Sequence, residues 1–262
     1  MSGPFDIFGL GADPDRPEES PARKAQIASA RPLPKRFYDS VDIEENAGFS
    51  LKLDGRPVRT PARQIISLPD RGMAEKLAEE WRAQETFIDP KTMPITRLVN
   101  SALDGVSTQS AAVATEILNF AGSDLLCYRA EDPERLVEQQ NKHWDPVLSW
   151  FEEEHGARFN LAAGVLYIEQ PEESLKVIET MISRYEDPLR LAALHSMTSL
   201  LGSCLLALAT GAGSLTVGRA WDAAHVDEDW NIEQWGADEE ATQRRAYRFE
   251  DMKAAGVLLG VG

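Results

Sequence analysis

The first clear pattern along the chain is an alternation of apolar and polar residues. GFSLKLDG, residues 48–55, places an apolar residue at every second position, and FYDSVDIEE, RPVRTP and QIISL are similar. A period of two is typical of a strand with one buried face. Asp54-Gly55 predicts a type I′ hairpin turn, because both residues tolerate positive φ. We predict a small antiparallel β meander with an exposed basic face that carries Arg56, Arg59 and Arg63.

Beyond residue 70 the apolar residues recur every three or four positions, which is typical of amphipathic helices. The first helix is predicted to bury Leu77 and Trp81 and to turn its charged residues, Glu80 among them, away from that face. Proline disfavours helix in the preceding residue. We therefore expect this helix to end at Asp89-Pro90.

A second helix is predicted to follow at once, with Thr92 as its N-cap and Pro94 in its first turn. Its apolar residues form one stripe from residue 95 to 106. Three polar residues fall outside that stripe, and we expect them either to be solvated or to cap a neighbouring element: Arg97, Asn100 and Asp104.

Several proline-led starts predict the remaining helices. Asp145-Pro146 predicts a break in the helix that begins at Asp132-Pro133. The segment 123–129 reads either as a helical turn or as an extended link, and 161–169 as an isolated strand or hairpin arm. The other helices are predicted over 110–122, from Pro171 and from Asp187-Pro188.

Residues 191–218 contain no Lys, Arg, Asp or Glu, and this length would permit a membrane span. A stripe of small and polar residues, including Ser196, Thr198 and Gly202, instead favours a central buried helix with close neighbours. We read His195 in this run as a core histidine whose hydrogen bonds are satisfied.

Together these elements predict an α+β fold, with a small N-terminal antiparallel β domain followed by a larger, mostly helical domain. Residues 1–34 hold few large apolar groups and are expected to be a tail. We predict a β domain over 35–70 and a helical domain over 71–262, with a short β arm near 161–168.

Composition narrows the class of protein. With 262 residues and 43% hydrophobic content, the chain can bury a core in two domains. A net charge of −16 argues against a nucleic-acid binder, which needs a basic surface. Cys127 and Cys204 lie far apart in apolar segments and read as buried thiols. No signal or transit pattern is found, so we expect no membrane association and a cytoplasmic location.

No motif for a phosphate-binding loop, a nucleophile turn or a dinucleotide fold is found. The cysteines and the four histidines lack the close pairing that zinc sites use. We therefore predict no cofactor, no metal and no catalytic activity. The alternative is a small-molecule enzyme or binding protein, with a site between the β and helical regions that uses His225, Asp229 or Glu240.

One segment stands out from this background. Residues 220–243 contain eight Asp and Glu, no Lys or Arg, and three of the six tryptophans, Trp221, Trp230 and Trp235. Uncompensated acids repel one another and become favourable when a cationic partner arrives, and tryptophans are frequent interface anchors. The segment is either a partner-binding surface or an acidic loop over a Trp-containing core.

Several irregular motifs occur in order along the chain: KRFY, LDGRPVRTP, LAEEWRAQ, IDPKTMPITRLVNSALD, DLLCYRAEDPERLVEQQNKHWDPVLSW and WNIEQWG. In these motifs the chain resembles the assembly chaperones for the α subunit of the ATP synthase catalytic head. The resemblance covers most of the chain beyond residue 34. It implies an α+β fold and no enzymatic activity.

The resemblance also implies a partner, the free α subunit, whose β-subunit-facing surface the chaperone shields until assembly. The lack of a transit peptide then indicates a bacterial cytoplasm, and we expect a monomer when the protein is free. The alternative is that the motifs mark only the fold and that the client differs. The candidate partner-binding residues are Asp229, Trp230, Glu233, Trp235, Asp238, Glu239 and Glu240.

Overall fold

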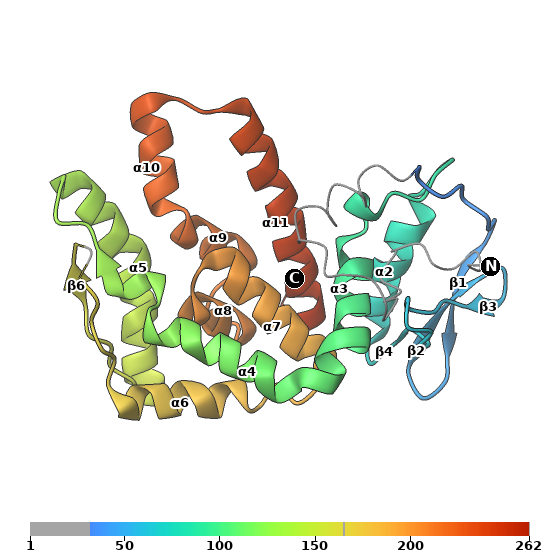
Figure 1. Cartoon of the computed structure of the whole chain (residues 1–262), viewed down its shortest axis with the longest axis horizontal. Helices are drawn as coiled ribbons and strands as arrows, with labels where there is room; N and C mark the ends of the chain where they lie inside the picture. Colours follow the sequence, from blue (N-terminus) through green and yellow to red (C-terminus); the bar gives the residue numbers. More distant parts are fainter. Residues whose placement is uncertain (1–31, 165, 262) are drawn as a thin grey trace, which may run out of the picture. The chain divides into compact units, whose positions relative to one another are not determined.

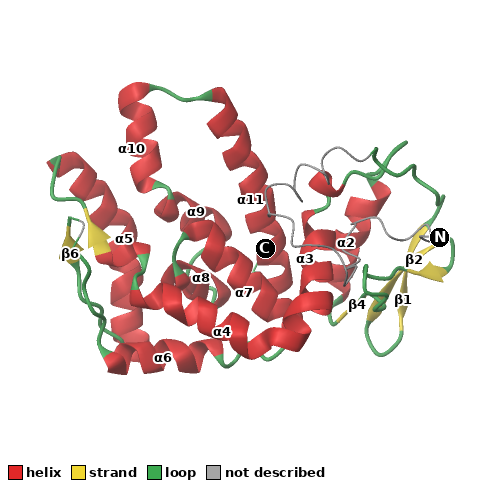
Figure 2. Ribbon diagram, in the orientation of Figure 1, coloured by secondary structure: helices red, strands yellow, loops and turns green. Residues whose placement is uncertain are grey.

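The computed structural model describes residues 32–164 and 166–261 (Figure 1). The predicted tail lies outside the described residues except for 32–34. A small antiparallel sheet is followed by a mostly helical region (Figure 2), which confirms the α+β class. The contacts form two compact units. We call the one that ends at Gly105 the sheet unit and the one that begins at Val106 the helical unit, whereas the sequence pattern predicts a division after residue 70.

The predicted meander is present. β1 (Val41–Glu45) pairs antiparallel with β2 (Phe49–Leu53), and β2 also pairs with β3 (Arg56–Pro57) and β4 (Ser67–Leu68). The pairing of Leu53 with Arg56 leaves a two-residue turn, Asp54-Gly55, between β2 and β3. The φ values of these two residues, 48° and 76°, confirm the type I′ prediction. The three arginines predicted on an exposed face are exposed.

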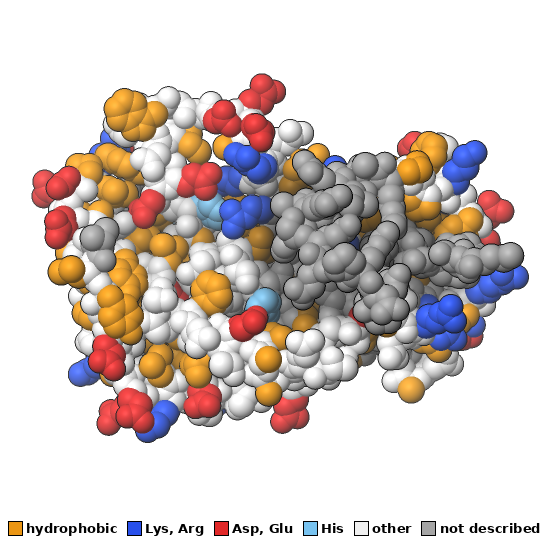
Figure 3. Space-filling view, in the orientation of Figure 1, with side chains coloured by type: hydrophobic (Ala, Val, Ile, Leu, Met, Phe, Trp, Pro, Cys, Tyr) orange, Lys and Arg blue, Asp and Glu red, His pale blue; other side chains and the backbone are white. Residues whose placement is uncertain are grey.

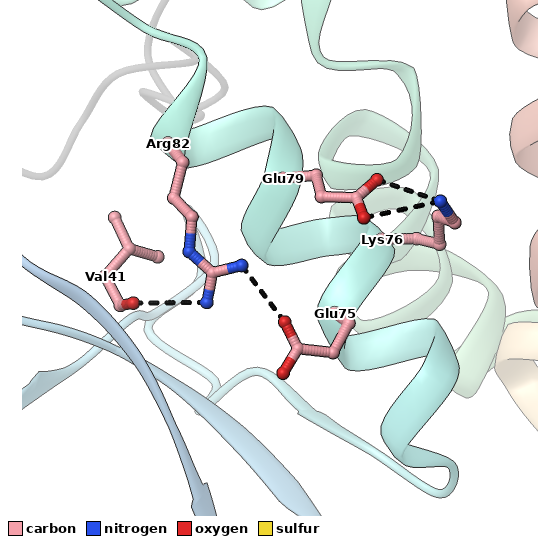
Figure 4. Close-up of polar contacts among 5 residues, drawn as sticks. All are labelled: Val41, Glu75, Lys76, Glu79 and Arg82. Atoms are coloured by element: carbon pink, nitrogen blue, oxygen red, sulfur yellow. Dashed lines mark hydrogen bonds and ion pairs between the residues drawn. The ribbon is translucent and has the colours of Figure 1, made fainter.

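Helix α2 (Arg71–Arg82) packs its apolar face in the sheet unit, where Leu77 and Trp81 are buried as predicted. The helix ends at Arg82, seven residues before the predicted stop. Figure 4 shows its outer face, where Arg82 donates to the carbonyl of Val41 in β1 at 3.3 Å and pairs with Glu75 at 3.0 Å. These contacts tie the helix to the edge strand of the sheet.

Glu80 contradicts the sequence prediction, because it turns toward the next helix. After the 3₁₀ turn η1 (Pro90–Thr92), α3 (Pro94–Ser101) begins with two backbone N–H groups, of Ile95 and Thr96, that donate to the Glu80 carboxylate at 2.6 and 2.8 Å. The predicted cap, Thr92, makes no such bond. Burial outweighs these donors and raises the pKa of Glu80 to about 7.

Asp104 caps a neighbouring element, which is one of the two roles expected for it. It lies in the π-helical turn η2 (Ala102–Val106) and accepts hydrogen bonds from the Thr60 hydroxyl and, at 2.9 Å, from the Ala62 N–H. It therefore holds the loop between β3 and β4.

The helical unit contains α4 (Ser107–Gly122), η3 (Leu125–Cys127), β5 (Tyr128–Arg129), α5 (Glu134–His155), β6 (Ala162–Ala163), α6 (Glu172–Ile182), α7 (Pro188–Leu201), α8 (Cys204–Gly211), α9 (Val217–Ala224), α10 (Val226–Trp235) and α11 (Glu239–Leu259). β5 and β6 form a two-stranded parallel sheet. The segment 123–129 thus contains both a helical turn and an extended link. Within the expected β arm, Ala162–Ala163 form β6, whose parallel pairing with β5 makes it neither an isolated strand nor a hairpin arm.

The predicted break at Asp145-Pro146 is wrong, because α5 runs through it. Contacts with other elements fix the helix on the N-terminal side of the proline. Asp145 pairs with the buried Arg129 at 2.8 Å, and the Trp144 indole N–H donates to the Ala223 carbonyl at 2.7 Å. Asp132 does not cap α5 as predicted, since Pro133 occupies the N-cap position without a side-chain bond.

The single buried helix predicted over 191–218 is two helices, α7 and α8. Gly202 adopts φ 64° after α7, and the Ser203 hydroxyl caps α8 by accepting from the Leu206 N–H at 3.0 Å. Within 32–164 and 166–261 the structure holds no helix long and apolar enough to cross a membrane. His195 is only half-buried and lies 3.1 Å from Glu116 of α4, so its assignment as a core histidine is wrong.

The start of α8 encloses a fully buried carboxylate. Asp124 accepts from the Ser203 hydroxyl at 2.7 Å and from the N–H groups of Leu126 and Leu205 at 3.1 and 3.0 Å. Burial raises the pKa of Asp124 to about 6. The thiols of Cys127 and Cys204 are free and buried, as predicted.

Candidate functional site

The acidic segment folds as two helices joined by a short loop. We call residues 226–245, which span α10 and the first turns of α11, the acidic hairpin. The prediction of a loop over the core is therefore wrong in its secondary structure. The hairpin carries all seven candidate residues: Asp229, Trp230, Glu233, Trp235, Asp238, Glu239 and Glu240.

The three tryptophans of this segment differ in burial. Trp221 of α9 is buried, Trp230 is half-buried, and Trp235, the last residue of α10, is 86% exposed. The exposure of the three tryptophans therefore increases in the order in which they occur along the chain. Trp221 thus belongs to the core and Trp235 lies on the surface, and the partner-binding reading of the segment stays a prediction.

Helix α5 anchors the base of the hairpin. Its Gln140 donates from Nε2 to the Asp227 carboxylate at 2.7 Å, while Gln140 Oε1 accepts from the Ala130 N–H at 2.8 Å. The Arg135 guanidinium lies 5.6 Å from the centre of the Trp230 ring and 3.7 Å from Glu233. Trp230 and Glu233 thus contact their own chain on the side of α10 that faces α5.

Some of the acids have cationic partners within the chain. Asp229 of α10 pairs with Arg245 of α11, and Glu240 pairs with Arg244 at 3.0 Å. The expectation of uncompensated charge is wrong for these acids. Arg244 lies one residue beyond the segment 220–243, and its spacing from Glu240 is that of a helical i,i+4 pair.

The end of the hairpin is formed by the loop between the helices. Gly236 adopts φ 88° and terminates α10, and Asp238 begins α11 by accepting the Ala241 N–H at 2.7 Å. Glu239 and Glu240 follow in the first turn, where the helix dipole favours negative charge. Within the part of the chain that is described, Glu239 has no ion-pair partner. Its carboxylate can therefore meet a cation from another molecule.

His225 is a structural residue. Its ring is buried, and its Nδ1 lies 2.7 Å from the Trp221 carbonyl oxygen. The centres of the His225 and Trp221 rings are 4.0 Å apart. Burial lowers the pKa of His225, which keeps it neutral at pH 7. The three residues of the enzyme alternative contact different partners: His225 the Trp221 carbonyl, Asp229 the guanidinium of Arg245, and Glu240 that of Arg244. Among the described residues no cluster of His, Cys, Asp or Glu is arranged to hold a metal ion.

The hairpin end therefore combines an exposed aromatic ring with carboxylates. Figure 3 shows acidic side chains and a hydrophobic group in open view where α10 ends and α11 begins. Such a surface can bury the ring against an apolar patch and pair its acids with Lys or Arg of a partner.

Comparison with known proteins gives consistent matches. Residues 35–152 match the family model described as ATP12 chaperone protein. The Atu1473 protein of Agrobacterium tumefaciens has 48% identity and a TM-score of 0.84, with 93% of this chain and 92% of that chain covered.

Two further matches carry the ATP12 name. Atp12 from Paracoccus denitrificans has 38% identity and a TM-score of 0.80, with 87% of this chain and 97% of that chain covered. Mitochondrial protein atp12 of Schizosaccharomyces pombe is 24% identical over 231 residues, which cover 83% of this chain and 79% of the relative. The resemblance read from the sequence motifs is confirmed, and the chain belongs to the ATP12 chaperone protein family.

Proposed function

We propose that this protein is a chaperone of ATP synthase assembly that binds the free α subunit of the catalytic head. In this role it covers the surface of the α subunit that later contacts the β subunit. Family membership supports the chaperone role, and the sequence motifs that resemble α-subunit chaperones support the client. The observation that carries the proposal is Trp235, whose ring is 86% exposed beside the acids of the hairpin end.

The binding step follows from this geometry. Trp235 enters an apolar patch of the client, while Glu239 and its neighbours pair with basic residues around that patch. Exposed aromatic side chains of this kind are typical hot spots, whose truncation costs about 2 kcal/mol or more. Trp235→Ala is therefore expected to weaken client binding by about 30-fold or more, because each 1.4 kcal/mol is tenfold.

The charge of the chain supports two further parts of the proposal. A net charge of −16 disfavours self-association and binding to nucleic acid. We therefore expect a monomer in the absence of client. We also propose a bacterial cytoplasmic location, which the similarity to the Agrobacterium and Paracoccus proteins supports. Sedimentation of the purified chain tests the oligomeric state.

The test uses the full chain as bait for purified α subunit, together with an aggregation assay without nucleotide. The charge variant is Glu239→Lys with Glu240→Lys. The matched control is Glu85→Lys with Glu186→Lys, which changes the net charge equally at exposed sites outside the hairpin. We expect the hairpin variant to lose α-subunit retention and protection, and the control to keep both.

Equal retention by wild type, hairpin variant and Trp235→Ala would remove the hairpin from the client interface. Failure of the wild-type chain to retain the α subunit at all would overturn the client assignment. Circular dichroism of each variant checks that the helices are intact.

A further inference from the structure

A second exposed surface lies in the segment that connects α5 to α6. Residues 161–164 and 166–168, which we call the apolar arm, read LAAG and LYI. Leu161 is 47% exposed, Leu166 is 76% exposed and Tyr167 is 73% exposed. Large apolar groups exposed next to one another indicate an interaction site, whereas a single one would need no explanation.

Hydrogen bonds at its two ends hold the apolar arm in place. The Asn160 N–H donates to Gln170 Oε1 at 2.9 Å, Gln170 Nε2 donates to the Asn160 carbonyl at 3.1 Å, and Asn160 Nδ2 donates to the Glu169 carbonyl at 2.9 Å. Gln170 is buried. The base of the arm is therefore closed by a fixed pair of amides, and the exposed residues are presented from it.

The arm also contains a strand with a free edge. β6 pairs with β5 on one side, and within the described ranges this sheet has no third strand. Such an edge offers unpaired backbone N–H and C=O groups to another extended chain. In this mode of binding the affinity comes from main-chain hydrogen bonds, so partners of varied sequence can bind.

Acidic residues flank the arm along the chain on both sides. Arg158 and Lys176 are the nearby bases of these flanks, and each already pairs with a glutamate, Arg158 with Glu152 and Lys176 with Glu172, both at 2.7 Å. Figure 3 shows hydrophobic side chains at this edge of the helical unit with acidic groups around them. The flanking acids that pair with no base among the described residues are Glu153, Glu154, Glu169 and Glu173.

We propose that the apolar arm binds an extended, non-native segment of a client polypeptide, which adds as a strand along β6. Its apolar side chains contact Leu166 and Tyr167, and Lys or Arg on either side of them pair with the flanking acids. A second copy of this chain is a poor occupant because like charges repel across such a rim. This inference rests on the proposed chaperone function and adds a second client-binding surface to it.

The probe is a fluorescein-labelled peptide with a core of five β-branched and aromatic residues flanked by two lysines at each end. Anisotropy is measured with the full chain and with Leu166→Ser/Tyr167→Ser. The matched control is Ile65→Ser/Phe87→Ser, which removes two exposed apolar groups, each 46% exposed, from the sheet unit. We expect the arm variant to bind at least tenfold more weakly and the control to bind within twofold of wild type.

Two altered peptides test the recognised chemistry. Replacing the lysines with glutamates is expected to weaken binding at least tenfold, because the flanking acids then repel the peptide. N-methylation at alternate backbone nitrogens is expected to do the same, because it removes donors to the β6 edge. Equal binding of the N-methylated peptide would overturn strand addition.

Unchanged peptide affinity in the arm variant, or no peptide binding by wild type, would overturn the proposal. A dimer in wild type that the arm variant dissolves would also overturn it, by showing a second copy as occupant. α-subunit retention is measured in parallel with the hairpin variants. Their failure to reduce retention would count against the hairpin alone and would leave the peptide result standing.

Discussion

Helices α8 and α11 each begin beside an aspartate that accepts backbone N–H groups, yet the two sites differ in burial. Asp124 at the start of α8 is fully enclosed, and burial raises its pKa to about 6. Asp238 at the start of α11 is exposed. The same capping chemistry thus serves two purposes. In the core the acid contributes to folding, whereas on the surface its charge remains available to a partner.

The largest effect is expected from Asp124→Ala. The substitution leaves the Ser203 hydroxyl and the N–H groups of Leu126 and Leu205 without an acceptor in the core. Each unsatisfied buried group costs about 1–3 kcal/mol, so we expect a loss of about 3 kcal/mol or more in the free energy of unfolding. Urea denaturation measures it. A loss below about 1 kcal/mol would show that other acceptors replace the carboxylate.

An intermediate effect concerns pH. The folded pKa of Asp124, about 6, lies above the ordinary value of 3.8, so the native state binds more protons between these values. The contribution of Asp124 to the free energy of unfolding is therefore largest below about pH 4 and decreases as pH rises to about 7. Relative to Asp124→Asn, the wild type is expected to lose on the order of 2–3 kcal/mol of unfolding free energy over that range.

The neighbouring thiols do not interfere with this titration. Burial raises the pKa of Cys127 to about 12 and that of Cys204 well above its ordinary value, so both stay neutral between pH 4 and 7. Urea denaturation of both proteins at several pH values gives the comparison. A difference in unfolding free energy between wild type and Asp124→Asn that does not change with pH would contradict the raised pKa of Asp124.

The smallest effect is expected at Asp238. Replacing this N-cap with Ala is expected to cost about 1 kcal/mol, and replacing it with Asn almost nothing, because Asn accepts the same N–H. Asp238→Asn removes one charge while keeping the helix start, so it separates the capping role of Asp238 from the role of its charge in client binding. Thermal unfolding reports the capping role, and α-subunit retention reports the role of the charge. Equal stability of the Ala and Asn variants would show that α11 does not depend on this cap.

Local patterns predict the fold well where a few adjacent residues decide the structure. The alternation over 48–55 and the Asp54-Gly55 turn are examples, because both depend on φ and side-chain direction within the segment. Glu80 and Pro146 are the opposite case. The Glu80 carboxylate meets a helix that begins fourteen residues later, and the helix around Pro146 is fixed by contacts with β5 and α9. No local window contains those partners.

The candidate site was predictable to a similar degree. The acidic run and its tryptophans mark the hairpin in the sequence, but Trp221, Trp230 and Trp235 look alike there. Their order from buried to exposed is set by where α5 and α9 lie. Arg245 illustrates the same limit, because it compensates Asp229 only once α10 and α11 are folded together.

The amide of Gln140 limits which residues this chain can carry at two positions. It is a donor toward Asp227 and an acceptor toward the Ala130 backbone. A glutamate at position 140 would place two carboxylates against each other, and an asparagine would be one methylene too short to reach both partners. Positions 140 and 227 are therefore constrained as a pair, and a substitution at one of them is tolerated when the other changes its hydrogen-bonding character to match.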